Sequence, residues 1–216
     1  MKILVILCSH EMNVCNLPNI DVLNCYVKEI QKDHIVDYCC ISGKDDFANY
    51  ETILTFKYKI INPRKQLTKM CEFIGTHRDE LNYDYYIKTR PDIKLLEQIN
   101  LNILSDTAIN ARARIYIGPQ TIKYGMSVNG AGVWRHIGNC SYDVCEKELI
   151  LDDAFYIFHN NIIKQEAFKS FPYNDDVSEH EWFQALHWKE CNIDLKIIGI
   201  NLEFTKNHTF SGDLNM

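Results

Sequence analysis

The chain has 216 residues, of which 46% are hydrophobic and 24% are charged, and these values are typical of one globular domain with a sizeable core. The net charge of −6 gives no general attraction to nucleic acid or to an anionic membrane. No apolar run reaches the roughly 18 residues of a membrane-spanning helix. We therefore expect neither a nucleic-acid partner nor a membrane span.

The beginning of the chain and its cysteines indicate where the protein resides. Residues 1–8 combine a basic residue with a short apolar run, but no small-residue cleavage site follows, so they predict a buried first strand rather than a signal peptide. Nine cysteines without a Cys-x-x-Cys pair predict free thiols in a reducing compartment, and we expect a cytoplasmic protein. No repeat or Gly/Ser linker divides the chain, which favours a single domain over residues 1–216.

The first half of the chain predicts alternating strands and helices. Residues 3–8 read as a continuous apolar strand, residues 19–32 have helical apolar spacing, and residues 35–42 return as a strand. Residues 54–60 alternate between apolar and polar side chains, which is typical of a strand with one wet face near a sheet edge. A helical stripe over residues 67–74 then leads to a strand over residues 83–90.

The second half is less regular. We expect a short helix or turn at residues 95–104, a strand at 114–118, and a long functional or mobile loop at 118–139, where five glycines occur. A strand at 149–158, helices at 161–171 and 178–191, and a last strand at 194–204 complete the prediction. This order implies an α/β fold with a mixed central sheet and helices on both faces.

The strand over residues 83–90 ends in Arg90-Pro91-Asp92. Proline ends the regular ladder, so a carboxylate is presented at the carboxyl end of a buried strand. In open α/β sheets ligands bind at that end, which makes Asp92 and Arg90 candidate site residues. The alternative is a strand-terminating turn with both side chains on the surface.

Two further groups of acids are candidates. Asp152 and Asp153 are adjacent on a strand and point to opposite faces, so one of them is expected to face a ligand, unless a bulge leaves both in water. Glu179 and Glu181 lie on the first turn of a helix that begins at Ser178, where the helix dipole favours carboxylates. One of these two is a candidate general base; the alternative is that Glu181 only caps the helix.

His208 follows the last predicted strand. Together with Asp92 it would form an oxygen and nitrogen site for a divalent ion such as Mn²⁺, whereas the alternative is an ordinary surface histidine. Other templates are missing from the sequence: there is no P-loop, no Gly-x-Ser-x-Gly and no Gly-x-Gly-x-x-Gly after the first strand. Their absence weighs against a P-loop NTPase, an α/β-hydrolase and a dinucleotide oxidoreductase.

Three runs of the sequence, residues 65–74, 83–92 and 151–156, together resemble a GT-A glycosyltransferase of the small type found in capsule biosynthesis and in large DNA viruses. The resemblance covers most of residues 1–200 and implies a GT-A-like, Rossmann-like fold, either complete or as the amino-terminal domain of a longer protein. It implies transfer of a glucose-like or deoxyhexose sugar from a UDP-sugar donor to a glycan or protein-linked glycan acceptor, assisted by Mn²⁺ or Mg²⁺. A viral source would place the protein in the host cytoplasm.

The resemblance also implies roles for individual residues. Arg90-Pro91-Asp92 occupies the place of the Asp-x-Asp motif, so Asp92 would bind the metal, while Arg90, which stands in place of an acid, would contact phosphate. Asp152 or Asp153 would contact the donor sugar or the acceptor. The residues implied to meet the nucleotide are Cys8, Ser9 and His10 at the base or ribose, and Arg64, Lys65 and Lys69 at the base or phosphates.

The stereochemical outcome stays open at this point. Glu181, or Glu179 in a shifted match, stands where inverting members carry their base, whereas His208 resembles the late histidine of the metal site in some retaining members. Two other functions also stay open. One is a non-catalytic nucleotide-sugar or glycan-binding module of a larger protein. The other is a different nucleotide-dependent transferase, which a wholly parallel strand order would favour.

Overall fold

The computed structural model describes residues 1–64, 66–117, 149–165 and 187–204, with residues 122–123, 126–127, 133–137, 140–141 and 168 between them. The first half contains β1 (Lys2–Cys8), η1 (Val14–Asn16), α1 (Leu17–Gln31), β2 (Ile35–Ser42), α2 (Ala48–Glu51), β3 (Phe56–Ile61), α3 (Gln66–His77) and β4 (Tyr85–Thr89). The second half contains β5 (Ile93–Leu95), η2 (Leu101–Ile103), β6 (Ala108–Ile117), β7 (Ile122–Lys123), β8 (Met126–Ser127), β9 (Val133–Ile137), β10 (Cys140–Ser141), β11 (Leu149–His159), α4 (Asn160–Ile163), β12 (Asp194–Ile197) and β13 (Leu202–Phe204).

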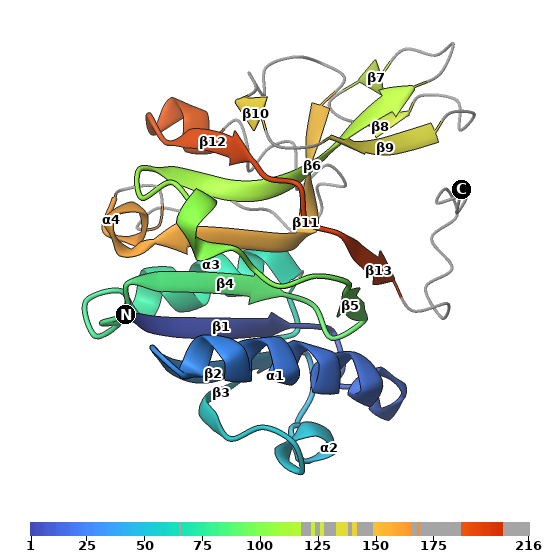
Figure 1. Ribbon diagram of the computed structural model, residues 1–216, viewed down its shortest axis with the longest axis vertical. Coiled ribbons are helices and arrows are strands. Elements are labelled where there is room, and N and C mark those ends of the chain that lie inside the picture. Colours follow the sequence, from blue (N-terminus) through green and yellow to red (C-terminus); the bar gives the residue numbers. More distant parts are fainter. Residues whose placement is uncertain are drawn as a thin grey trace.

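A nine-stranded mixed sheet forms the centre of the described fold (Figure 1). Its strand order is β10-β12-β6-β11-β4-β1-β2-β3, and β9 pairs with β6. The neighbours in the series β4-β1-β2-β3 are parallel, whereas β11 runs antiparallel to both β4 and β6. The predicted α/β class with a mixed sheet is therefore confirmed, and the order is not the wholly parallel one that would have favoured a different nucleotide-dependent transferase.

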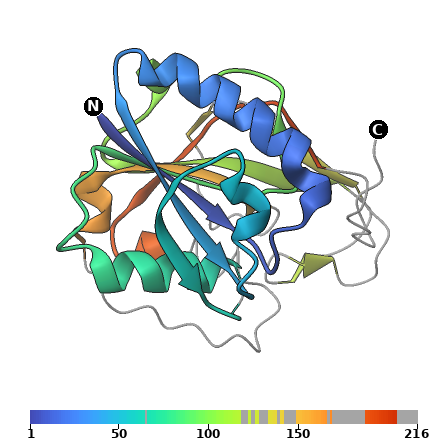
Figure 2. The same ribbon diagram turned by 90° about the horizontal axis from the view of Figure 1, so that it is seen from below.

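The two faces of the sheet are covered by different helices because the side chains of β1 alternate. Leu4 and Ile6 pack in one core cluster with α3 and α4, and Ile3 and Val5 pack in another with α1. Figure 2 shows α1 above the sheet and α3 below it. Every residue of β1 after Lys2 is fully buried, as the continuous apolar run predicts for a strand that is covered on both faces.

The sheet reverses its direction of growth at β1. The chain passes from β1 through α1 to β2 on one side, and then from β3 through α3 to β4 on the other side of β1. Both connections lead to strands parallel to β1, so the carboxyl ends of β1 and β4 lie side by side. Such a topological switch point is where open α/β sheets bind ligands.

The strands and helices of the first half confirm the sequence prediction, and β3 lies at the edge of the sheet with an alternation of half-buried and exposed residues. The second half differs in several places. The short helix predicted within residues 95–104 is present as η2, but residues 93–95 before it form a strand. The predicted last strand is divided between β12 in the main sheet and β13, which pairs with β5. The strand predicted at 114–118 begins at Ala108, because alanine-rich residues have low strand propensity and hide its start. The described helix α4 ends at Ile163.

The long loop predicted at 118–139 is wrong for residues 133–137, which form β9 and pair antiparallel with β6. It is also wrong for residues 122–123 and 126–127, which form the antiparallel pair β7 and β8. Seven of the nine cysteines, Cys8, Cys15, Cys25, Cys39, Cys40, Cys71 and Cys191, are free thiols, as predicted. None of the described helices combines the length and the apolar character that crossing a bilayer requires. The compartment stays a prediction.

Candidate functional site

Arg90 and Asp92 form a bidentate ion pair at the carboxyl end of β4. The Nε of Arg90 donates to Oδ1 of Asp92 at 2.9 Å, and Nη2 donates to Oδ2 at 2.6 Å. Only 3% of Arg90 and 6% of Asp92 is exposed. The alternative of a surface turn is therefore wrong, because both charged groups lie inside the protein beside the switch point.

Asn19 fixes this turn to the beginning of α1. Its side chain is buried, and its Nδ2 donates to the carbonyl of Pro91 at 3.1 Å. The backbone N–H of Ile93 closes the turn on the carbonyl of Arg90 at 3.3 Å. Sequence reasoning missed Asn19, since an asparagine on the first turn of a helix is interpreted locally as a capping residue.

The loop after β1 is held from three directions at Ser9 and His10. The N–H of Ser9 donates to the carbonyl of Ile41 at 3.0 Å, and the N–H of Gly43 donates to the carbonyl of His10 at 3.1 Å. The fully buried Lys69 of α3 donates from Nζ to the carbonyl of Ser9 at 2.6 Å. A Cβ at Gly43 would lie 2.6 Å from the carbonyl oxygen of His10, so glycine is required for this approach.

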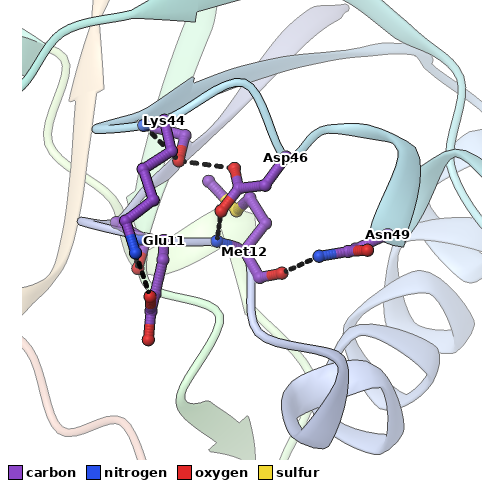
Figure 3. Close-up of polar contacts among 7 residues, drawn as sticks. Glu11, Met12, Lys44, Asp46 and Asn49 are labelled. Atoms are coloured by element: carbon purple, nitrogen blue, oxygen red, sulfur yellow. Dashed lines mark hydrogen bonds and ion pairs between the residues drawn. The ribbon is translucent and has the colours of Figure 1, made fainter.

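A network around Asp46 continues this attachment along the loop (Figure 3). Its carboxylate accepts from the N–H of Met12 at 2.7 Å and from the hydroxyl of Ser42 at 2.7 Å, and Asn49 donates to the carbonyl of Met12 at 2.6 Å. Lys44 joins this network through its N–H, which donates to the hydroxyl oxygen of Ser42 at 3.3 Å. Its side chain pairs with Glu11 at 2.7 Å, and this hydrogen bond lowers the pKa of Glu11. The loop therefore has one fixed backbone path past the switch point.

The residues expected to meet the nucleotide occupy different environments. Ser9 and His10 lie on the fixed loop at the switch point, whereas the side chain of Cys8 is fully buried in the core with α3. Lys69 is buried and holds the loop rather than standing free at the surface. Arg64 lies beyond β3 and forms an exposed ion pair with Glu72.

Asp152 and Asp153 lie on β11 where its pairing with β6 shifts. Leu151 is opposite Ala113 and Tyr156 is opposite Ala111, so four residues of β11 oppose a single residue, Arg112. The bulge that the sequence left as an alternative is therefore present in the backbone. Bulges re-aim side chains, so the expectation that the two acids point to opposite faces no longer follows from strand alternation.

Several predicted site residues lie outside the described part of the chain, and their roles stay predictions. These are Lys65, Glu179, Glu181 and His208, together with the side chains of Asp152 and Asp153. Among the described residues, no group of three His, Cys, Asp or Glu side chains is placed to hold a metal ion.

Five charged side chains are buried in the described part of the chain: the carboxylate of Asp92 and the cations of Lys69, Lys88, Arg90 and Arg112. Arg90 pairs with Asp92, and Lys69 donates to the carbonyl of Ser9.

No protein-family model matches the sequence, and no curated protein matches it. Solved structures do share the fold. A protein from Bacillus anthracis described as a glucose-1-phosphate thymidylyltransferase, in complex with sucrose, is 11% identical over 100% of this chain and 97% of its own, with a TM-score of 0.55. The protein A197 from STIV is 10% identical over 96% of this chain and 87% of its own, with a TM-score of 0.53. At these identities the similarity shows the fold alone.

Proposed function

We propose that this chain is a transferase that uses a nucleotide-sugar donor and binds the donor diphosphate at the carboxyl ends of β1 and β4. The observation that carries the proposal is the buried Arg90–Asp92 pair at the switch point of the sheet. The fold shared with a protein described as a thymidylyltransferase supports it.

The chemistry follows from where charge develops. When a sugar leaves its diphosphate, the bond between the anomeric carbon and the phosphate oxygen breaks and negative charge grows on that oxygen. Asp92 fixes the plane of the Arg90 guanidinium through two hydrogen bonds, so the cation meets this charge without reorganising. The acceptor oxygen forms the new bond to the anomeric carbon, and its proton passes to a base, for which Glu179, Glu181 and Asp153 stay the predicted candidates.

Within this class we propose glycosyl transfer from a UDP-sugar to a glycan acceptor. The fold similarity also favours a second candidate, nucleotidyl transfer from a nucleoside triphosphate to a sugar phosphate. The loop after β1 argues for the first, because residues 9–16 contain no glycine. Loops that cradle several phosphates are rich in glycine, because their backbone N–H groups must turn toward the ligand.

The described residues do not by themselves fit the predicted Mn²⁺ or Mg²⁺. Asp92 supplies one carboxylate, and both of its oxygens accept from Arg90. Its negative charge is already compensated, and the other predicted ligand, His208, lies outside the described residues. The charge stabilisation proposed above therefore depends on the cationic side chains, and metal dependence stays a prediction.

Calorimetric titration with UDP and with uridine, each with Mn²⁺ and with a chelator, tests the proposal. We expect UDP to bind and uridine to bind far more weakly, because the diphosphate is the recognised group. No binding of UDP in either condition would refute the proposal. Asp92→Ala is expected to abolish any metal-dependent part of the affinity, and an unchanged affinity would remove Asp92 from the site.

Product analysis separates the candidate reactions. Release of UDP from a UDP-sugar, with the sugar joined to an oligosaccharide or to water, would support glycosyl transfer. Release of pyrophosphate from UTP or dTTP and a sugar 1-phosphate would support nucleotidyl transfer instead. Binding without either product would identify a nucleotide-sugar-binding module.

A further inference from the structure

Lys88 is a buried lysine in the middle of β4. Its Cα lies opposite Ile6 of β1 and Tyr156 of β11, so it is flanked by strands on both sides. The residue is 0% exposed, and its Nζ has no hydrogen-bond partner in the part of the chain that the structure describes. The Nζ of Lys88 makes a cation–π contact with the ring of Tyr156, whose centroid lies 5.6 Å away.

The surroundings of Lys88 do not compensate its charge. A cation over an aromatic ring recovers only part of the hydration that an ammonium group loses on burial. Cys71 of α3 lies close enough to interact electrostatically, but burial raises the pKa of its thiol well above the ordinary value, and Lys88 offsets this only in part. The Cys71 thiol is therefore neutral and cannot serve as the counter-ion.

The position of Lys88 relates it to the proposed diphosphate site. It precedes Arg90, the first residue after β4, by two residues, a separation of about 6–7 Å along an extended chain. Tyr86 lies two residues before Lys88 and therefore on the same face of β4. It packs in the core cluster of α3, the helix from which Lys69 reaches the loop at Ser9. The one buried carboxylate of the described part, Asp92, already accepts two hydrogen bonds from Arg90.

We propose that Lys88 is a second cation of the diphosphate site, whose ammonium group binds a phosphoryl oxygen beneath Arg90. The inference rests on the proposed function, and it adds a residue that neither strand alternation nor family resemblance indicated. The lysine side chain has a flexible four-carbon stem, so the ammonium group can turn from the ring of Tyr156 toward Arg90 when the anion binds. The cost of keeping this amine unpartnered in the free protein is then recovered when the ligand binds.

The test compares wild-type protein with Lys88→Met, which keeps the apolar stem and removes the amine. The matched control is Lys28→Met, which removes an equal charge from an exposed position on α1. Titrations use UDP, inorganic pyrophosphate and uridine, and thermal unfolding is measured without ligand. We expect Lys88→Met to weaken UDP and pyrophosphate binding by roughly 10- to 100-fold, as for loss of a charged hydrogen bond, to leave uridine unchanged, and to unfold at or above the wild-type temperature.

The outcomes separate the two proposals. Equal affinity of Lys88→Met and wild type for UDP and pyrophosphate would overturn the role of Lys88 and leave the proposed function standing. Loss of folding in Lys88→Met would also overturn it, since the amine would then stabilise the fold. Binding of pyrophosphate but not UDP by wild type would refute the nucleotide-sugar function. In that case the role of Lys88 would be decided by the pyrophosphate affinities of wild type and Lys88→Met, and equal affinities would overturn it. Binding of neither would refute both proposals.

Discussion

The change Asp92→Asn tests whether the Arg90–Asp92 pair behaves as a buried ion pair. The substitution keeps the size of the side chain and one acceptor oxygen, but it removes the negative charge. The side chains of Arg90 and Asp92 are only 4% and 8% exposed, and two hydrogen bonds of 2.9 and 2.6 Å join them. The variant therefore removes the carboxylate charge that pairs with a buried guanidinium.

The magnitude follows from these contacts. Removing one partner of a buried ion pair costs about 3–5 kcal/mol, and the retained amide oxygen recovers part of this through one hydrogen bond of roughly 1 kcal/mol. We expect a loss of about 2–4 kcal/mol in the free energy of unfolding. For a chain of this size that corresponds to a decrease in Tm of roughly 4–16 °C.

Guanidinium chloride unfolding, followed by the fluorescence of the three tryptophans, gives the measurement. The matched control is Glu51→Gln, which removes one carboxylate from the exposed pair with Lys59, where 41% of Glu51 and 48% of Lys59 is exposed. This control is expected to cost less than about 1 kcal/mol. If Asp92→Asn costs no more than Glu51→Gln, the pair is not desolvated and the reasoning about the site fails.

Three other changes address the loop and the opposite end of the sheet. Gly43→Ala places a Cβ 2.6 Å from the carbonyl of His10, so we expect a loss of about 1–3 kcal/mol in denaturant unfolding together with weaker UDP binding in titration. Asp46→Ala removes the acceptor of the Met12 N–H on the loop and of the Ser42 hydroxyl at the end of β2, and a loss of about 1–3 kcal/mol in the same unfolding assay is expected. Burial alone would raise the pKa of Asp37, but the hydrogen bond from Lys57 contributes to a net lowering. Because the pKa of Asp37 is lower in the folded state, its carboxylate stabilises the fold at pH values above the unfolded pKa of roughly 4. This stabilisation is lost as the pH falls through the folded-state pKa. The stability deficit of Asp37→Asn should therefore shrink between pH 7 and acid, and a deficit that is constant in urea unfolding across this range would contradict the assignment.

The elements that could be predicted from the sequence are those whose pattern is local. The apolar run of β1 and the apolar–polar alternation of β3 each indicate, within a few consecutive residues, which side chains are buried. Both strands are where they were expected. The pairing of β5 with β13 joins segments of three residues that lie about a hundred positions apart, and such short segments have no periodicity of their own. The sequence could not indicate that pairing.

The candidate site shows the same limit. Pro91 made the end of β4 predictable, and with it the position of Arg90 and Asp92 at the carboxyl edge. Their mutual ion pair was not predicted, because each side chain was interpreted as a contact for a ligand. Lys88 was missed because a lysine in an alternating strand is usually interpreted as facing water. It is buried because β11, which follows more than sixty residues later in the sequence, pairs with β4 and covers that side of the strand.

The edge strand β3 has a consequence for the behaviour of the protein at high concentration. Its outer edge presents unpaired backbone groups, to which a strand of another molecule could add. Lys57 and Lys59 stand at alternate positions of this strand, paired with Asp37 and Glu51. A second copy docking there would bring like charges together, and at the other end of the described sheet β10 is only two residues long. Both edges therefore discourage the growth of fibrils by strand addition, and replacing the two lysines with threonine should raise the tendency to aggregate.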